Sequence, residues 1–311
     1  MTKFAIAFPG QGSQSVGMLA ELVEQHAVVS ETFAEASEVL GYDLLNLVLN
    51  GPADDLNKTW RTQPALLTAS VALWRLWQQQ GGAQPAVLAG HSLGEYSALV
   101  CAGALAFADA VKLVELRGHA MQAAVPEGVG AMAAIIGLDN DVIAANCELA
   151  AQGQVVSPVN YNSPGQVVIA GHKEAVERAN VLMKESGAKR ALPLPVSVPS
   201  HCALMQPAAD KLAEALATIE IKAPQIPVIN NVDVAQETDP ARIRDALVRQ
   251  LFSPVRWTEV VESMANAGVT YEIEMGPGKV LTGLVKRIDK RVEGAAINDQ
   301  ASLQACLDMF K

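Results

Sequence analysis

The sequence lacks three features that would each point to a different class of protein. Its four cysteines (Cys101, Cys147, Cys202 and Cys306) show no paired spacing, which favours reduced thiols over a disulfide framework or a zinc site. Basic residues are in the minority, with 23 Lys and Arg against 33 Asp and Glu and a formal net charge of −10. This balance argues against binding to nucleic acid or to an anionic membrane, without excluding a local basic patch.

A long hydrophobic run is the third missing feature. The longest nearly uncharged apolar stretch, residues 97–108, is shorter than the roughly 20 residues of a membrane helix. Near the N-terminus, the apolar run at residues 4–8 is too short for a signal-peptide core of about 7–15 residues. We therefore expect a cytoplasmic protein that does not bind membranes.

The 311 residues, 50% of them hydrophobic, alternate between short apolar runs and amphipathic stretches. This alternation predicts an α/β fold with a mainly parallel sheet. Buried strands are predicted by apolar runs at residues 3–8, 86–90, 226–232 and 270–276. Helices are predicted at residues 18–26, 63–81, 206–217, 240–252 and 257–268, from residue 93 and after Gly278.

Between these elements the order changes. Strands are predicted at residues 130–138, 155–162, 166–171 and 188–196, with helices at 139–153 and 172–187. The order β-α-β-β-α-β is typical of a ferredoxin-like module. We therefore predict a discontinuous large domain of residues 1–125 and 200–311, into which a small subdomain of residues 126–199 is inserted.

The stretch "VLAGHSLGE" at residues 87–95 contains a Gly-x-Ser-x-Gly pattern around Ser92. The pattern follows an apolar strand and opens a helix, as a nucleophile elbow requires. Gly90 and Gly94 allow a sharp turn, and the helix N-terminus aims backbone N–H groups at the site. The alternative is a tight turn that binds an anion.

A serine nucleophile needs a base, and five histidines are available. His201 follows the inserted segment, at a domain junction where clefts form, although a packed or capping histidine is the alternative. His91 adjoins Ser92, and its side chain should leave the backbone in another direction, so we expect a structural role. His26 and His119 are expected to be solvated, and His172 is expected to be a surface residue. Cys202 has neither an elbow nor a second histidine beside it.

No acid completes a triad in the usual chain order. The acids between Ser92 and His201 lie in or beside predicted helices, and none ends a strand of the main sheet. We therefore expect a Ser–His dyad whose histidine is oriented by a neutral group. Such a dyad favours a thioester over an amide, because a thiol leaving group, with a pKa of about 8–9, needs little protonation.

Arg117 falls on the apolar side of a helix predicted over residues 107–125. A buried guanidinium needs a partner, so it either reaches solvent or clamps a substrate carboxylate.

Two glycine-rich loops are weaker signals. "GQGSQSVG" has Ser15 where a dinucleotide fingerprint needs glycine, and it can instead donate an N–H to an oxyanion. "GPGK" at residues 276–279 lacks phosphate-loop spacing.

Together these residues resemble the malonyl-CoA:acyl carrier protein transacylases of bacterial fatty acid synthesis. Eight blocks in order carry the resemblance, namely "FPGQGSQ" (8–14), "TQPAL" (62–66), "GHSLGEYSAL" (90–99), "RG" (117–118), "NYNSPGQVVIAG" (160–171), "VSVPSHCALM" (196–205), "QLFSPVRW" (250–257) and "EMGPGKVL" (274–281). The resemblance implies a hydrolase-like α/β domain with an inserted ferredoxin-like subdomain. It also implies a ping-pong transfer in which Ser92 is acylated, His201 is its base and the Gln250 carbonyl orients the histidine.

The resemblance further assigns the oxyanion hole to the backbone N–H groups of Gln11 and Leu93, and the malonyl carboxylate to Arg117. Leu93, where methylmalonyl-selective relatives have glutamine, favours unbranched malonyl. The implied partners are malonyl-CoA and acyl carrier protein, with no cofactor or metal, and we expect a monomer. The carrier protein is expected to be acidic, so docking needs basic residues. Ordinary solvated charge is the alternative for the candidates, which are Lys189, Arg190, Lys286, Arg287, Lys290 and Arg291.

Two other functions remain open at this point. A serine hydrolase or thioesterase on the same scaffold would lose the acyl group to water without a thiol acceptor. A non-catalytic module that binds the carrier protein would form no covalent adduct.

Overall fold

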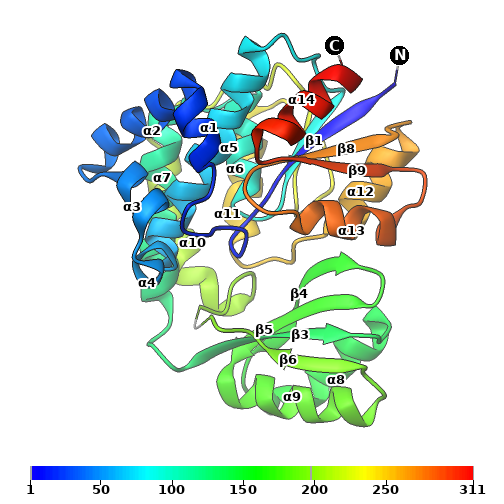
Figure 1. The fold of residues 1–311 in the computed structure, drawn as a ribbon. Coiled ribbons are helices and arrows are strands. Elements are labelled where there is room, and N and C mark those ends of the chain that lie inside the picture. The colour runs from blue at the N-terminus through cyan, green and yellow to red at the C-terminus, as the bar shows by residue number, and fades with distance from the viewer. Residues whose placement is uncertain (1, 197, 311) are drawn as a thin grey trace.

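The main sheet brings together five parallel strands from both ends of the chain (Figure 1). The computed structural model describes residues 2–196 and 198–310. The strands are β1 (Phe4–Phe8), β2 (Val87–Gly90), β7 (Val228–Ile229), β8 (Tyr271–Met275) and β9 (Glu293–Ile297), in the order β7-β2-β1-β8-β9. The mainly parallel α/β sheet predicted from the sequence is confirmed.

Helices cover both faces of this sheet, so its strands are buried on both sides, as in other parallel sheets. Ile6 and Phe8 of β1 face the larger core, whereas Ala5 and Ala7 face a smaller one. The larger core is closed mainly by α1 (Ala20–Gln25), α2 (Ala27–Leu40), α3 (Leu44–Asn50), α4 (Ala53–Leu56), α5 (Thr59–Gln79), α6 (Gly94–Cys101), α7 (Phe107–Ala124), α10 (Gln206–Leu216), α11 (Pro240–Gln250) and α14 (Gln300–Met309). The smaller core lies under α12 (Trp257–Asn266) and α13 (Val280–Ile288).

The second sheet is antiparallel and comes from one continuous part of the chain. Its elements run β3 (Gly130–Ile136), α8 (Asn140–Ala151), β4 (Val156–Ser163), β5 (Gln166–His172), α9 (Lys173–Glu185) and β6 (Arg190–Pro193). The strand order β4-β5-β3-β6 is that of a ferredoxin-like sheet, as the sequence predicted.

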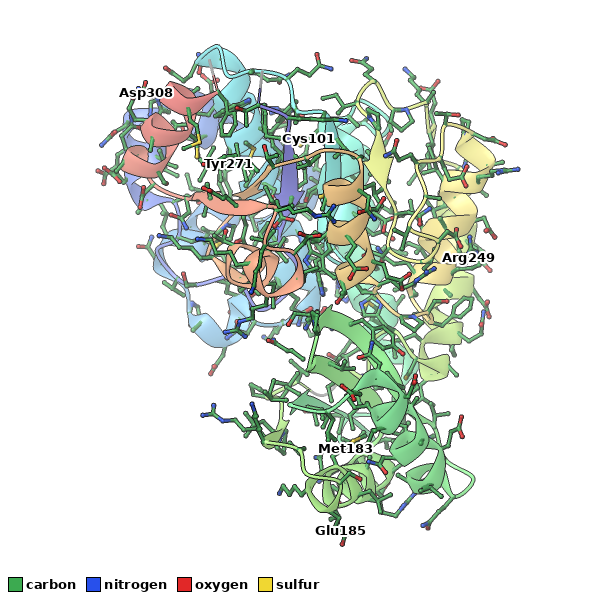
Figure 2. The ribbon with its side chains drawn as sticks, turned by 90° about the vertical axis from the view of Figure 1, so that its right-hand side faces the viewer. Cys101, Met183, Glu185, Arg249, Tyr271 and Asp308 are labelled. Atoms are coloured by element: carbon green, nitrogen blue, oxygen red, sulfur yellow. The ribbon has the colours of Figure 1, made fainter. Side chains whose placement is uncertain are left out.

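The two faces of the antiparallel sheet meet different neighbours. Helices α8 and α9 pack on the face away from the main sheet, and Figure 2 shows Met183 and Glu185 of α9 at that far end. Met132 and Val168 on the other face pack against Cys202, which precedes the short 3-10 helix η1 (Ala203–Met205). This inner face is therefore available to build a site between the sheets.

Several element boundaries differ from the sequence prediction. The strand predicted at 226–232 contains only Val228 and Ile229, because Asn231 turns its backbone N–H to Glu95 and its side chain to the loop after β2. Helix α5 starts at Thr59, before Pro64, because tertiary burial along the helix outweighs the missing proline N–H. Strand β9 and helices α2, α3, α4 and α14 were not predicted from the sequence. None of the helices in residues 2–196 and 198–310 has the length and apolar character that a membrane crossing requires.

Two buried acids lie two residues apart on strand β8, which neighbours the central strand β1. Glu272 and Glu274 point to the same face of the sheet, which is the face of the smaller core. Thr282 donates its N–H and its hydroxyl to Glu274, at 2.8 and 2.7 Å. Glu272 has no hydrogen-bond partner among the described residues. Burial, reinforced by Glu274, raises the pKa of Glu272 to about 8.

We predict that Glu272→Leu stabilises the protein more at high pH than at low pH. Folded Glu272 keeps its proton up to about pH 8, whereas the unfolded chain releases it near pH 4.3. The stabilising contribution of this group is thus complete below about pH 4 and is lost as the pH rises through about 8. Urea unfolding at pH 5 and pH 8.5 should show an advantage for the variant that is about 4 kcal/mol larger at pH 8.5. Glu262→Gln, at an exposed site on α12, is the control, and a pH-independent advantage contradicts the prediction.

Candidate active site

Ser92 occupies a sharp turn between β2 and α6. Its φ is 52°, in the left-handed region that side chains rarely adopt. The flanking glycines are required by close contacts: a Cβ on Gly90 would lie 1.9 Å from the carbonyl carbon of Gly94, and one on Gly94 would lie 2.1 Å from the carbonyl oxygen of Phe8. The turn therefore has the strand–turn–helix geometry of a nucleophile elbow.

His201 lies directly opposite this serine. Its Nε2 is 2.8 Å from the Oγ of Ser92, and its Nδ1 is 2.7 Å from the main-chain carbonyl oxygen of Gln250. A carbonyl only accepts, so Nδ1 carries the hydrogen, and Nε2 of the neutral ring is left to accept from the serine hydroxyl. The Gln250 carbonyl therefore has the position that the predicted neutral orienting group would need to hold the ring of His201.

The environment of His201 keeps the imidazole uncharged. The side chain is buried, and this desolvation, with a further contribution from the positive charge of Arg117, lowers the pKa of His201 to about 3. The hydrogen bond to Gln250 acts in the opposite direction but is weaker. The ring is therefore neutral near neutral pH, with the Nε2 lone pair directed at the serine hydroxyl.

Arg117 projects from α7 into the same site and is only 1% exposed. Its Nη1 donates to the side-chain oxygen of Gln63 at 2.8 Å. Its Nη2 donates to the side-chain oxygen of Gln250 at 3.0 Å and to the Oγ of Ser92 at 3.2 Å. Within residues 2–196 and 198–310 no acid forms an ion pair with it. The guanidinium does not reach solvent, and its charge can be matched by an anionic ligand.

A pocket of about 590 Å³ opens in front of these groups. Gln11, Ser92, Leu93, Arg117 and His201 all line it. Among the described residues, no hydrogen bond uses the backbone N–H of Gln11 or of Leu93. Both are free to bind a developing oxyanion. The wall opposite them is built by the antiparallel sheet and the segment that follows it, with Met132, Asn160, Leu194, Pro195 and Val196.

Three buried residues that the sequence reading did not single out support this site. Asn231 accepts the backbone N–H of Ser92 at 2.8 Å and donates to the carbonyl of Gly90 at 2.8 Å. Glu95, the first acid of α6, is 3% exposed and accepts from Asn231 and Gln250. Gln63, on α5, holds Arg117. The sequence feature that could have identified such residues is a polar side chain within an otherwise apolar stretch, such as Glu95 in "LGEYSALV".

The other histidines and Cys202 lie outside the Ser92–His201 pair. His91 bonds to Asn162 at 2.8 Å and packs beside Trp257, which agrees with a structural role. Exposed His119 fits the expectation of a solvated residue, whereas His26 and His172 are partly buried and hydrogen-bonded to Gln300 and Val155. Burial raises the pKa of the Cys202 thiol to about 11, which does not suit a nucleophile.

Arg190 and Arg287, two of the six candidate basic residues, lie near one end of the strands of the antiparallel sheet, and Lys189 and Lys286 adjoin them in the chain. Arg190 and Gln166 both pair with Ile136, so they lie two strand spacings apart, about 10 Å. Arg287 of α13 donates to the side chain of Gln166 at 3.2 Å. We call this group, formed by Lys189, Arg190, Lys286 and Arg287, the basic patch. Arg291 instead pairs with Asp289, and Lys290 lies beside it in the chain, just after the C-terminal end of α13.

The described residues contain no cluster of His, Cys, Asp or Glu that could hold a metal ion. The arrangement of serine, neutral histidine and free N–H groups suits acyl transfer through a serine ester. The acyl transferase domain family matches residues 6–302, and the chain belongs to that family.

Relatives that match along the whole chain carry a more specific name. The Salmonella typhimurium protein named malonyl CoA-acyl carrier protein transacylase is 69% identical over 307 residues, which cover 99% of each chain. An acyl carrier protein S-malonyltransferase from Vibrio cholerae has a TM-score of 0.96 at 74% identity and covers 98% of this chain and 99% of its own. A malonyl-transacylase in complex with its type II PKS acyl-carrier protein has a TM-score of 0.98 at 64% identity and covers 99% and 100%.

We predict that a serine-directed fluorophosphonate labels Ser92 at a nearly constant rate between pH 8 and pH 5.5. The imidazole of His201 stays neutral over this range because its pKa is about 3. A base with the ordinary histidine pKa of about 6.5 would make labelling roughly tenfold slower at pH 5.5. Stopped-flow or gel-based labelling measures the rate, with His201→Gln as the unreactive control. A tenfold fall at pH 5.5 in folded protein would contradict the prediction.

Proposed function

We propose that this protein transfers a malonyl group from malonyl-CoA to the phosphopantetheine thiol of acyl carrier protein, through an ester on Ser92. The observation that carries the proposal is Arg117, whose Nη2 lies 3.2 Å from the Oγ of Ser92. A buried guanidinium at this distance from a nucleophile suits an acyl group that ends in a carboxylate. The names of the relatives support the same substrate and acceptor.

In the first half-reaction, the Oγ of Ser92 attacks the thioester carbonyl carbon while its proton passes to Nε2 of His201. The Gln250 carbonyl holds the ring and stabilises the imidazolium that forms. The oxyanion accepts hydrogen bonds from the N–H groups of Gln11 and Leu93. The carbon–sulfur bond then breaks, and CoA leaves as a thiol with the proton from His201.

The second half-reaction reverses these roles with a different thiol. The phosphopantetheine thiol of the carrier protein gives its proton to His201 and attacks the ester carbonyl. The carbon–oxygen bond breaks, and His201 returns the proton to Ser92. Malonyl-CoA is thus a substrate, and the scheme uses no further cofactor. Every group in it comes from one chain, which supports a monomer as the working unit.

Residues 126–199 are proposed as an inserted subdomain between the two parts of a catalytic domain, 1–125 and 200–311. Its strands β3 to β6 all belong to one sheet, which supports that division. The basic patch is proposed to dock the acidic carrier protein. Arg190 starts β6 and Leu194, just after its end, lines the pocket, so the patch lies roughly 13 Å from the rim.

We predict that incubation with malonyl-CoA alone adds one malonyl group to Ser92, found by intact mass and peptide mapping. We expect the ester to persist for minutes without a thiol acceptor, and carrier protein should remove it. Ser92→Ala is the unlabelled control. Rapid hydrolysis without carrier would indicate a thioesterase, and no adduct would indicate a binding module; either result contradicts the proposal.

We predict that Arg117→Ala lowers kcat/KM for malonyl loading by 100-fold or more and leaves acetyl loading within about threefold or raises it. The variant removes the partner of the malonyl carboxylate, and losing one member of a buried charge pair costs about 2–5 kcal/mol. Arg75→Ala, which breaks an arginine–Glu35 pair away from the pocket, should leave the malonyl-to-acetyl ratio unchanged. Equal losses for both acyl groups would contradict the role of Arg117.

A further inference from the structure

A buried carboxyl group lies behind the nucleophile elbow without touching any reacting atom. Glu95 opens the first turn of α6, three residues after Ser92. Its Oε2 accepts the main-chain N–H of Asn231 at 2.9 Å and the side-chain amide of Gln250 at 2.9 Å. One oxygen atom thus joins the loop after β7 to the end of α11.

Both amide side chains continue from Glu95 to Ser92. Asn231 Oδ1 accepts the N–H of Ser92 at 2.8 Å, and Gln250 Nε2 donates to its carbonyl at 3.0 Å. The two peptide groups on either side of the strained residue are therefore each fixed by a partner that Glu95 holds. The left-handed φ of Ser92 needs such support, because this conformation is disfavoured for serine.

The same contact reaches the other two functional side chains. Gln250 presents its main-chain carbonyl to His201 and its side-chain oxygen to Arg117, at 2.7 and 3.0 Å. A shift of this glutamine would move the base and the guanidinium together. We propose that Glu95 is a positioning residue, which sets the alignment of Ser92, His201 and Arg117 through Asn231 and Gln250. The proposal rests on the proposed function.

The two hydrogen bonds at position 95 depend more on an acceptor oxygen at the right distance from the backbone than on a negative charge. Both donors belong to neutral amides, and burial raises the pKa of Glu95 to about 7, so the neutral group is accessible near neutrality. The carboxyl group also borders a small cavity lined by Asn230 and Glu237. Glutamine has nearly the same shape as glutamate, so its nitrogen can take the place of Oε1 while its oxygen keeps both bonds.

The test compares two conservative variants that change opposite properties. Glu95→Gln keeps the acceptor oxygen at full length and removes the charge. Glu95→Asp keeps the charge and withdraws the oxygen by one methylene. We expect Glu95→Gln to retain kcat/KM for malonyl loading of Ser92 within about threefold, and Glu95→Asp to lose at least thirtyfold. The loss should fall mainly on kcat and should affect acetyl loading as well as malonyl loading, since the elbow and the histidine serve both.

Controls separate positioning from folding and from the proposed function. Glu237→Gln alters the same cavity without touching the hydrogen bonds of Glu95, and it should match the wild type. Thermal unfolding of each variant is measured under the assay conditions. Equal damage in both Glu95 variants, or full activity of folded Glu95→Asp, overturns the proposal. If Glu95→Asp does not fold, a large activity loss in folded Glu95→Gln still overturns it, and retained activity supports it. Failure of the wild type to load malonyl overturns the proposed function instead.

Discussion

The main-chain carbonyl of Gln250, at the end of helix α11, is the group on which the geometry of the site depends. The last carbonyls of a helix have no partner within it, and the residue four positions after Gln250 is Pro254, which has no N–H to donate. This carbonyl is therefore free to accept from His201. The bond decides which ring nitrogen faces Ser92, and thus whether the serine has a base.

The choice of a neutral orienting group is linked to the presence of Arg117. Gln250 touches the guanidinium with its side chain and the imidazole with its main chain, so a carboxylate in its place would lie close to the arginine. Such an acid would pair with Arg117 and compete with a substrate carboxylate. The neutral amide satisfies the hydrogen bonds of the guanidinium but leaves its charge unmatched. The missing acid therefore suits an anionic acyl group as well as a thiol leaving group.

Local patterns made part of this structure predictable. The elbow is encoded within five residues, "GHSLG", after an apolar strand, and the ferredoxin-like order follows from regular periodicity. The supporting contacts are not local, since Asn231 and Ser92 are 139 residues apart and a side-chain pattern does not specify such pairs. The same contacts explain why β7 is shorter than its apolar run suggested. Asn231 leaves the sheet to hold the elbow instead of extending the strand.

The backbone strain in the site has a direct chemical use. Ser92 and His201 both have positive φ values, 52° and 64°, and each such residue costs on the order of 1–3 kcal/mol unless its surroundings hold it in place. Asn231 and Gln250 hold the peptide groups of Ser92, while Leu251 accepts the N–H of His201. The Oγ and Nε2 atoms are consequently at hydrogen-bond distance before any substrate binds. Folding, and not substrate binding, supplies the free energy of this alignment, so binding energy remains for stabilising the transition state.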